Sequence, residues 1–278
     1  MSIMTEHGKN SDSEYRANIE RFTGFAFTYD KYRPKPPSII IDILTKLAKA
    51  DRPDLVVDLG CGTGLSTRIW KDRAEKVIGV EPSDDMRNFA MGNTSALNIT
   101  YQAGCSHKTG LPDKCADIVT CSQSLHWMEP NATFKEIARI LRPGGVFAAY
   151  DCDWPPVMFN WEAEAAISEF MQRFRDLGKE SGAYDDLKRW WKTEHLDRMR
   201  ESGLFSYTKE MLLHHSEEGN AERLIGYIHA LGGFKALLKH GTTEGEIGFE
   251  EFRERINELL GTELKPWHFS YRMRVGIV

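Results

Sequence analysis

The sequence predicts an α/β fold in which helices cover a mostly parallel sheet. Strand-like and helical segments alternate between residues 55 and 150, as strand–helix–strand units require. Within this region, residues 56–64 (VVDLGCGTG) join an apolar, strand-like run to a glycine-rich turn. The chain has 278 residues, which is enough for one large domain or for one domain with a substantial insertion, and we favour the insertion.

The elements follow in order from the apolar pattern. A helix is predicted over 38–50, because Ile40, Ile41 and Leu44 share one face and Ser38 is placed to cap it. Strands are predicted at 55–59, 76–80, 99–103, 116–121 and 145–150. The intervening helices are predicted at 65–71, 84–91 and 132–141.

The second half of the chain has a different character. Residues 161–202 and 221–262 are rich in helical patterns, whereas 207–214 and 266–278 read as strands. We interpret these two strands as the last of the sheet, with the helical segments inserted as a cap. The predicted divisions are a mobile lead-in (1–20), a core (21–155), a helical lid in two parts (156–205 and 217–264), and two core strands (206–216 and 265–278).

The glycine-rich turn indicates the kind of ligand. Gly60, Gly62 and Gly64 permit positive φ and a close approach of the backbone to a ligand. A dinucleotide-binding G-x-G-x-x-G pattern needs glycine where Leu65 stands, and a phosphate-binding P-loop needs a lysine there. The turn therefore predicts an adenosine-type ligand without a phosphate to hold.

Two acids flank this turn. Glu81 ends the second predicted strand, where a carboxylate can accept hydrogen bonds from both ribose hydroxyls of a nucleoside; the alternative is a solvated acid in a turn. Asp58 precedes the turn, where its carboxylate can bind the loop, face a ligand ammonium group, or do both.

Composition limits the functional classes. The net charge of −5 comes without a stripe of lysine and arginine, which argues against a nucleic-acid-binding surface. No apolar run is long enough to span a membrane. The polar first twenty residues favour a cytoplasmic protein. The five cysteines form no C-x-x-C pair, so we expect reduced thiols and no metal site; a soft-metal or arsenic acceptor at Cys105, Cys115 and Cys121 is the minor alternative.

Several short motifs together resemble a known family. The stretches DLGCGTG (58–64), EPS (81–83), LP (111–112) and LRPGG (141–145) are similar in order and spacing to the motifs of class I S-adenosylmethionine-dependent methyltransferases. The aromatic and basic run 22–37 and the SLHW stretch 124–127 further resemble the trans-aconitate methyltransferase-like branch, which acts on small molecules. The resemblance covers residues 20–155 well and the rest weakly. It implies a Rossmann-like sheet of seven strands, mostly parallel, with the last strand antiparallel.

The resemblance also implies roles for individual residues. The backbone at 60–62 would pass along the cofactor, Glu81 would hold the ribose, Pro82 and Met86 would pack on the adenine, and Ser122 and Gln123 would lie near the sulfonium. The acid that commonly contacts the adenine amino group is missing, since Gly104 is followed by Cys105 and Ser106. The residues expected to contact S-adenosylmethionine, or its product S-adenosylhomocysteine, are Tyr32, Arg33, Asp58, Gly60, Cys61, Gly62, Thr63, Gly64, Glu81, Pro82, Met86, Cys105, Ser106, Ser122 and Gln123.

The candidate catalytic residues are His126, Gln123 and Arg33. A neutral His126 can orient or deprotonate an acceptor, with Trp127 as a wall, or both can simply pack at a corner. Arg33, beside Tyr32, can bind a carboxylate of the cofactor or of an acidic acceptor, or can be a surface arginine. Asp151, Asp153 and Trp154 follow the fifth strand and are close enough in sequence to reach the site.

We therefore expect a methyltransferase that acts on a small molecule, such as a carboxylate, by in-line displacement, and that exists as a monomer or homodimer. The same fold with a protein or nucleic acid acceptor is one alternative, and a module that senses the cofactor without catalysis is another. A nicotinamide oxidoreductase is disfavoured by Leu65.

Overall fold

A seven-stranded mixed sheet is the framework of the computed structural model, which describes residues 16–278. The strand order is β3-β2-β1-β4-β5-β7-β6, and β7 runs antiparallel to both β5 and β6 while the other pairs are parallel. This confirms the predicted Rossmann-like α/β sheet, including its antiparallel last strand. The strands are β1 (Leu55–Leu59), β2 (Lys76–Val80), β3 (Ile99–Gln102), β4 (Ala116–Ser122), β5 (Leu141–Cys152), β6 (Tyr207–Gly219) and β7 (Lys265–Ile277).

Two apolar layers cover the sheet, because neighbouring residues of a strand point to opposite faces. On one face, Val57 and Leu59 pack with Phe134 and Ile137 of α6 (Pro130–Ile140). On the other face, Val56 packs with Ile40 and Leu44 of α4 (Ile39–Leu47). Burial on both faces explains why the central strands are continuous apolar runs rather than alternating ones.

The remaining elements are helical. The helices of the first half are α2 (Arg16–Glu20), α3 (Ala26–Tyr32), α5 (Asp84–Gly92) and the 3-10 turns η1 (Arg68–Trp70) and η2 (Leu125–Trp127). Those of the second half are α7 (Trp161–Glu180), η3 (Lys192–Glu194), α8 (His195–Glu201), α9 (Ala221–His229), α10 (Gly232–Lys239), α11 (Glu244–Ile247) and α12 (Phe249–Leu260).

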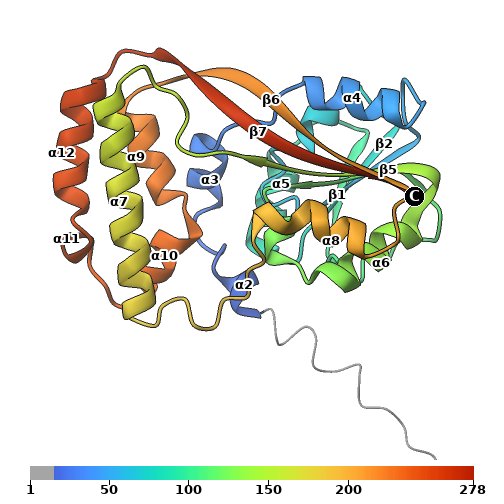
Figure 1. Ribbon diagram of the computed structural model, residues 1–278, viewed down its shortest axis with the longest axis horizontal. Coiled ribbons are helices and arrows are strands. Elements are labelled where there is room, and N and C mark those ends of the chain that lie inside the picture. The colour runs from blue at the N-terminus through green and yellow to red at the C-terminus, as the bar shows by residue number, and fades with distance from the viewer. Residues whose placement is uncertain (1–15) are drawn as a thin grey trace, which may run out of the picture.

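A helical cap lies beside the sheet. In Figure 1, helices α7, α9, α10, α11 and α12 form the left-hand part of the molecule, and the long strands β6 and β7 connect it to the sheet, with α3 between the two parts. The cap has its own apolar core, in which the rings of Phe170, Phe174 and Phe234 pack together. This arrangement agrees with the predicted insertion of helices around the sixth strand.

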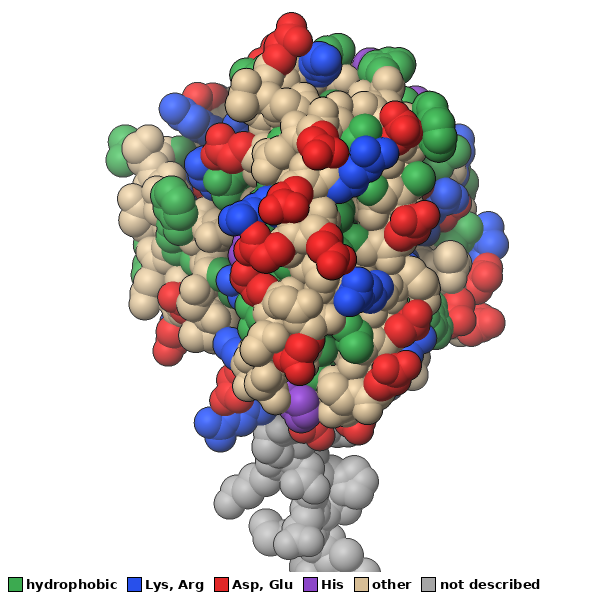
Figure 2. Space-filling model, turned by 90° about the vertical axis from the view of Figure 1, so that its left-hand side faces the viewer, with side chains coloured by type: hydrophobic (Ala, Val, Ile, Leu, Met, Phe, Trp, Pro, Cys, Tyr) green, Lys and Arg blue, Asp and Glu red, His purple; other side chains and the backbone are tan. Residues whose placement is uncertain are grey.

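The outer face of the cap carries both kinds of charge. Figure 2 shows acidic and basic side chains interspersed over it, without a continuous basic stripe on this face. Among residues 16–278, every helix is too short or too polar to cross a lipid bilayer.

The structure differs from the predictions for three elements. The helix expected over 65–71 is replaced by turns and the short η1, because the hydroxyls of Ser66 and Thr67 donate to Asp58 and compete with helical hydrogen bonding. Helix α8, placed in the lid by the sequence, packs on the sheet instead, where Met199 joins the core over Val57. Strand β6 extends to Gly219, beyond the expected 216.

The lead-in predicted for 1–20 also ends earlier. Residues 16–20 form α2, and Asn18 is buried, with its Nδ2 donating to the carbonyls of Lys188 at 2.7 Å and Trp127 at 3.3 Å. The rest of that predicted segment, residues 1–15, lies outside the described residues.

The cap core gives a direct stability prediction. Phe234 is fully buried among aromatic rings, so Phe234→Ala should lower the free energy of unfolding by about 3–5 kcal/mol through lost burial and an unfilled cavity. Urea denaturation measures this. The matched control Phe27→Ala, at a ring that is 68% exposed, should change the free energy by less than about 0.5 kcal/mol. Equal stabilities for the two variants would contradict the packing described.

Candidate functional site

The glycine-rich turn after β1 adopts the backbone that only glycine favours. Gly60, Gly62 and Gly64 have φ of 64°, 56° and 84°. A Cβ on Gly60 would lie 2.8 Å from Ser124 Cβ, so both this close contact and the positive φ favour glycine there. A Cβ on Gly62 would meet no atom within 4 Å, because this residue borders a cavity. The turn therefore presents open backbone to whatever fills that cavity.

Asp58 fixes this turn from behind. Ser66 Oγ and Thr67 Oγ1 donate to Asp58 Oδ2 at 2.6 and 2.7 Å, and Thr120 Oγ1 donates to Oδ1 at 2.9 Å. The carboxylate is fully buried, which raises its pKa, while the three hydroxyl donors oppose that shift. Asp58 thus orders the loop, and it does not line the cavity.

Glu81 holds the other side of the turn. The amide of Gly62 donates to Glu81 Oε2 at 3.0 Å, and the amide of Ser83 donates to Oε1 at 2.9 Å. Burial raises the pKa of the Glu81 carboxyl to about 6, against the effect of these two amide donors. The carboxylate lines the cavity and is positioned to accept further hydrogen bonds from a ligand.

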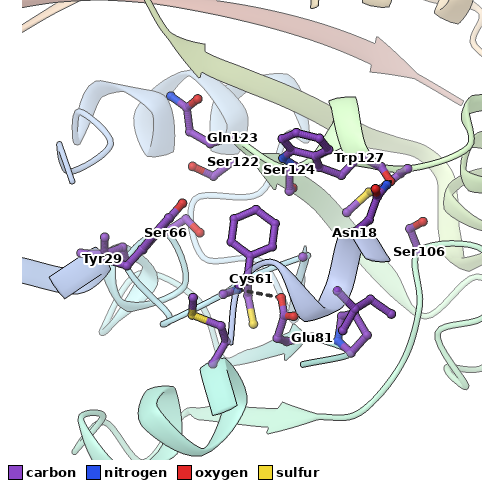
Figure 3. Close-up of a pocket in the computed structure, with 18 of the residues that line it drawn as sticks. Asn18, Tyr29, Cys61, Ser66, Glu81, Ser106, Ser122, Gln123, Ser124 and Trp127 are labelled. Atoms are coloured by element: carbon purple, nitrogen blue, oxygen red, sulfur yellow. Dashed lines mark hydrogen bonds between the residues drawn. The ribbon is translucent and has the colours of Figure 1, made fainter. Parts of the chain in front are cut away.

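A first cavity opens at the carboxyl ends of β1, β2 and β4. Figure 3 shows Cys61 and Glu81 on one side of it, with Ser122, Gln123 and Trp127 opposite. In a doubly wound sheet this is where the strand order reverses and ligands bind. The predicted cofactor residues that line this cavity are Arg33, Gly60, Cys61, Gly62, Glu81, Pro82, Met86, Cys105, Ser106, Ser122 and Gln123.

Four predicted cofactor contacts lie elsewhere. Tyr32 faces α9, where its ring covers Gly226 and its hydroxyl donates to Glu222 at 3.0 Å. Thr63 is fully buried. Gly64 packs against Tyr101, whose hydroxyl would lie 2.4 Å from an added Cβ. Asp58 is the fourth, because its oxygens already accept three hydrogen bonds. These four residues therefore do not line the first cavity.

A second cavity, with a volume of about 360 Å³, adjoins the first beneath the helical cap. The residues that line both cavities are Phe22, Tyr29, Arg33, Pro34, Gln123 and Trp127. His126 lines only the second cavity. Gln123, at the end of β4, has an uncommon φ of 55°, the type of strained backbone that is frequent at functional sites.

The second cavity is strongly basic. Five of its lining side chains are cationic, and no Asp or Glu from the described part of the chain lines it. Arg33 lies over the rings of Tyr29 and Tyr227, at 5.1 and 4.9 Å from their centroids. The five basic residues are Arg21, Arg33, Arg175, Arg189 and Lys192.

Lys192 connects this cavity to the sheet. Its Nζ lies 2.7 Å from Asp151 Oδ1 and donates to Gln123 Oε1 at 2.8 Å. Burial lowers the pKa of Lys192, and the adjacent Asp151 opposes that shift. Asp151 also lies 3.8 Å from His126 Nδ1, and burial holds the pKa of His126 well below its usual value. The imidazole is therefore neutral at neutral pH.

Other expected residues have simpler positions. Trp154 lines the second cavity, with a buried Nε1 that has no partner among residues 16–278. Asp153 lies on the surface side, beside Arg272 at 3.4 Å. Within the described residues, no group of His, Cys, Asp and Glu side chains is arranged to hold a metal ion.

Sequence reasoning missed several lining residues. Asn18 falls in the segment assigned to a lead-in, and Arg189 and Lys192 lie in RWWK (189–192), which matches no motif. The aromatic and basic character of the 22–33 segment was the available signal for Phe22 and Tyr29. No comparable signal marked Lys192, because its contact with Gln123 spans 69 residues.

Comparisons with known proteins identify the domain. A family model described as a methyltransferase domain matches residues 57–149. A Dictyostelium discoideum protein named "Putative methyltransferase" is 23% identical over 225 residues, 81% of each chain. An uncharacterized methyltransferase of Mycobacterium tuberculosis is 37% identical over 120 residues, 42% of this chain and 46% of that protein, so the shared region is about half of this relative's length.

A solved structure shows the same fold. It is a type II methyltransferase of Anaeromyxobacter dehalogenans, described as putative, with a TM-score of 0.62 and 22% identity; the match covers 88% of this chain and 98% of the other. The matched domain, the named relatives and the sheet all indicate a methyltransferase. They do not test the predicted resemblance to the trans-aconitate methyltransferase-like branch. The chain thus contains a class I methyltransferase domain that uses S-adenosylmethionine.

Proposed function

We propose that this protein methylates a small-molecule acceptor, with the cofactor in the first cavity and the acceptor in the second. The observation that carries the proposal is the junction at Gln123, which lines both cavities. S-adenosylmethionine supplies an electrophilic methyl group on a sulfonium. The protein's part is then to align an acceptor atom and to exclude water, which is worth about 7–11 kcal/mol of activation free energy in well-oriented systems.

The residues of the first cavity fit the cofactor. Each carboxylate oxygen of Glu81 accepts one amide hydrogen bond and can accept another from the cavity side. Two ribose hydroxyls could therefore donate to it. Gly62 leaves the space that a side chain would fill. Ser106 is the polar side chain in place of the missing acid; its hydroxyl hydrogen-bonds Thr133 at 2.8 Å and can also contact an adenine edge.

The second cavity supports an anionic acceptor, such as a carboxylate. Five of its lining residues are cationic and none of those described is an acid, so even with Lys192 paired to Asp151 behind the lining the cavity favours a negatively charged molecule. A carboxylate needs no general base. In this proposal Lys192 and Arg33 bind the acceptor's charge, and neutral His126 orients it.

The size and position of the second cavity favour a small acceptor over a macromolecule. The second cavity lies under the cap, and its volume falls in the range of small-molecule sites. A protein or nucleic acid acceptor would require an open face at this position.

The titration of Glu81 predicts how cofactor binding depends on pH. The carboxylate form is the one that accepts ribose hydrogen bonds, and its pKa in the free protein is raised to about 6. Affinity for S-adenosylhomocysteine, measured by calorimetry, should therefore weaken about tenfold as the pH falls from 7 to 5, since the protonated form accumulates below pH 6. Glu81→Gln should bind weakly at both pH values and show little pH dependence. A steep pH dependence in Glu81→Gln would assign the titration to another group.

Replacing Lys192 should affect the acceptor without affecting cofactor binding. Because Lys192 lines only the second cavity, Lys192→Met should lower kcat/KM for an acidic acceptor by roughly tenfold to a hundredfold, and it should leave S-adenosylhomocysteine affinity within about twofold. The exposed Lys209→Met is the matched control and should have no effect. Loss of cofactor affinity in Lys192→Met would contradict the proposed division.

Transfer of labelled methyl from S-adenosylmethionine to a panel of carboxylates, alcohols, amines and thiols tests the function itself. Labelling of a small carboxylate is the expected result. Cofactor binding without transfer to any acceptor would favour a sensing module. Transfer that requires an added protein or RNA would favour the macromolecular alternative.

A further inference from the structure

Helix α10 begins at the wall of the second cavity. Gly232 and Gly233 are its first residues, and both line the cavity. The preceding Leu231 offers no side-chain cap, and the first turn contains no acid. The amides of Gly232, Gly233 and Phe234 donate to no residue within 16–278. These uncapped donors, at the positive end of the helix dipole, favour an anion.

Arg21 lies directly against this helix start. A Cβ built on Gly232 would be 2.7 Å from Arg21 Nε, and the guanidinium carbon lies 4.1 Å from the Trp127 ring centroid. Only 9% of Arg21 is exposed, and its Nε and Nη1 have no hydrogen-bond partner among the described residues. Burial lowers the pKa of Arg21 to about 10, so the group is still charged at neutral pH.

A buried, charged guanidinium without an acceptor is unfavourable and calls for an explanation. The neighbouring cations make the position still less favourable, because the positive charge of Arg189 acts on Arg21, and that of Arg175 acts on Arg189. An oxyanion in the second cavity, beside both the helix start and Arg21, would satisfy the unpaired donors and offset this repulsion.

We propose that Arg21 and the first turn of α10 form an oxyanion subsite, which binds a carboxylate or phosphate group of the acceptor other than the group near Gln123. The proposal rests on the proposed function in treating the second cavity as the acceptor site. The two glycines have a clear role in this subsite. A Cβ at 232 would collide with Arg21, and one at 233 would lie 3.2 Å from the Tyr184 hydroxyl, so the glycines allow the Arg21 guanidinium to lie directly beside the free amides of the helix start. The acceptor is therefore a small molecule with at least two anionic groups.

Inorganic phosphate is the probe for this subsite. The full chain, first alone and then saturated with S-adenosylhomocysteine, is titrated with phosphate while amide chemical shifts are recorded by NMR. The amides of Gly232 and Gly233 should shift in a saturable manner at millimolar phosphate. The absence of any shift in these two amides would overturn the proposal, whether or not S-adenosylhomocysteine binds. Failure of S-adenosylhomocysteine to bind would instead remove the proposed function.

Substitutions test whether Arg21 is the side chain that binds phosphate. Arg21→Gln should weaken phosphate binding at least about tenfold, and Arg21→Lys should retain part of the affinity. Arg16→Gln, which removes an exposed arginine of α2 just before Arg21 in the chain, is the matched control and should leave phosphate binding unchanged. S-adenosylhomocysteine affinity reports that each variant is folded. Equal phosphate affinity in wild type and in folded Arg21→Gln would contradict the assignment. Replacing phosphate with acetate shows which oxyanion the subsite prefers.

Discussion

The buried carboxylate of Asp58 is the interaction on which the site depends. Its two oxygens accept hydrogen bonds from Ser66, Thr67 and Thr120, and so join β1, the glycine-rich turn and β4. This bonding replaces a regular helix after the turn with the short η1, and it holds the backbone of Gly60 and Gly62 against the first cavity. Glu81 completes the arrangement by accepting from the Gly62 amide. Three neutral donors offset the cost of burying Asp58, and its carboxylate stabilises the loop rather than contacting the first cavity.

A second important feature is the group of side chains at the boundary between the two cavities. Asp151, at the end of β5, pairs with Lys192 and Arg274 and lies near His126. Lys192 in turn donates to Gln123, whose backbone is in an uncommon conformation at the boundary. Through Asp151 and Gln123, the sheet therefore determines where the Lys192 ammonium group lies relative to the first cavity. This relation matters for methyl transfer, because the reaction tolerates little error in alignment.

The sequence predicted the sheet because the information is local: buried strands, turn glycines and a motif order that recurs in one family. For the same reason it pointed to Glu81 and Gly62 as cofactor contacts, and both line the first cavity. It did not reveal that Tyr32, Thr63 and Gly64 pack away from the first cavity, because motif membership does not say which side of the backbone a side chain occupies. It could not find Arg21 or Lys192, since their positions depend on packing of the cap against the core, through contacts between residues distant in sequence. The fold was thus mostly predictable, and the acceptor side was not.

The central claim is that one cavity holds the cofactor and the adjoining one holds the acceptor. A crystal structure of the full chain with S-adenosylhomocysteine tests it most directly. We expect the ribose hydroxyls at Glu81 and the sulfur directed past Gln123 into the second cavity. A sulfur atom directed away from that cavity, or a ribose remote from Glu81, would contradict the account.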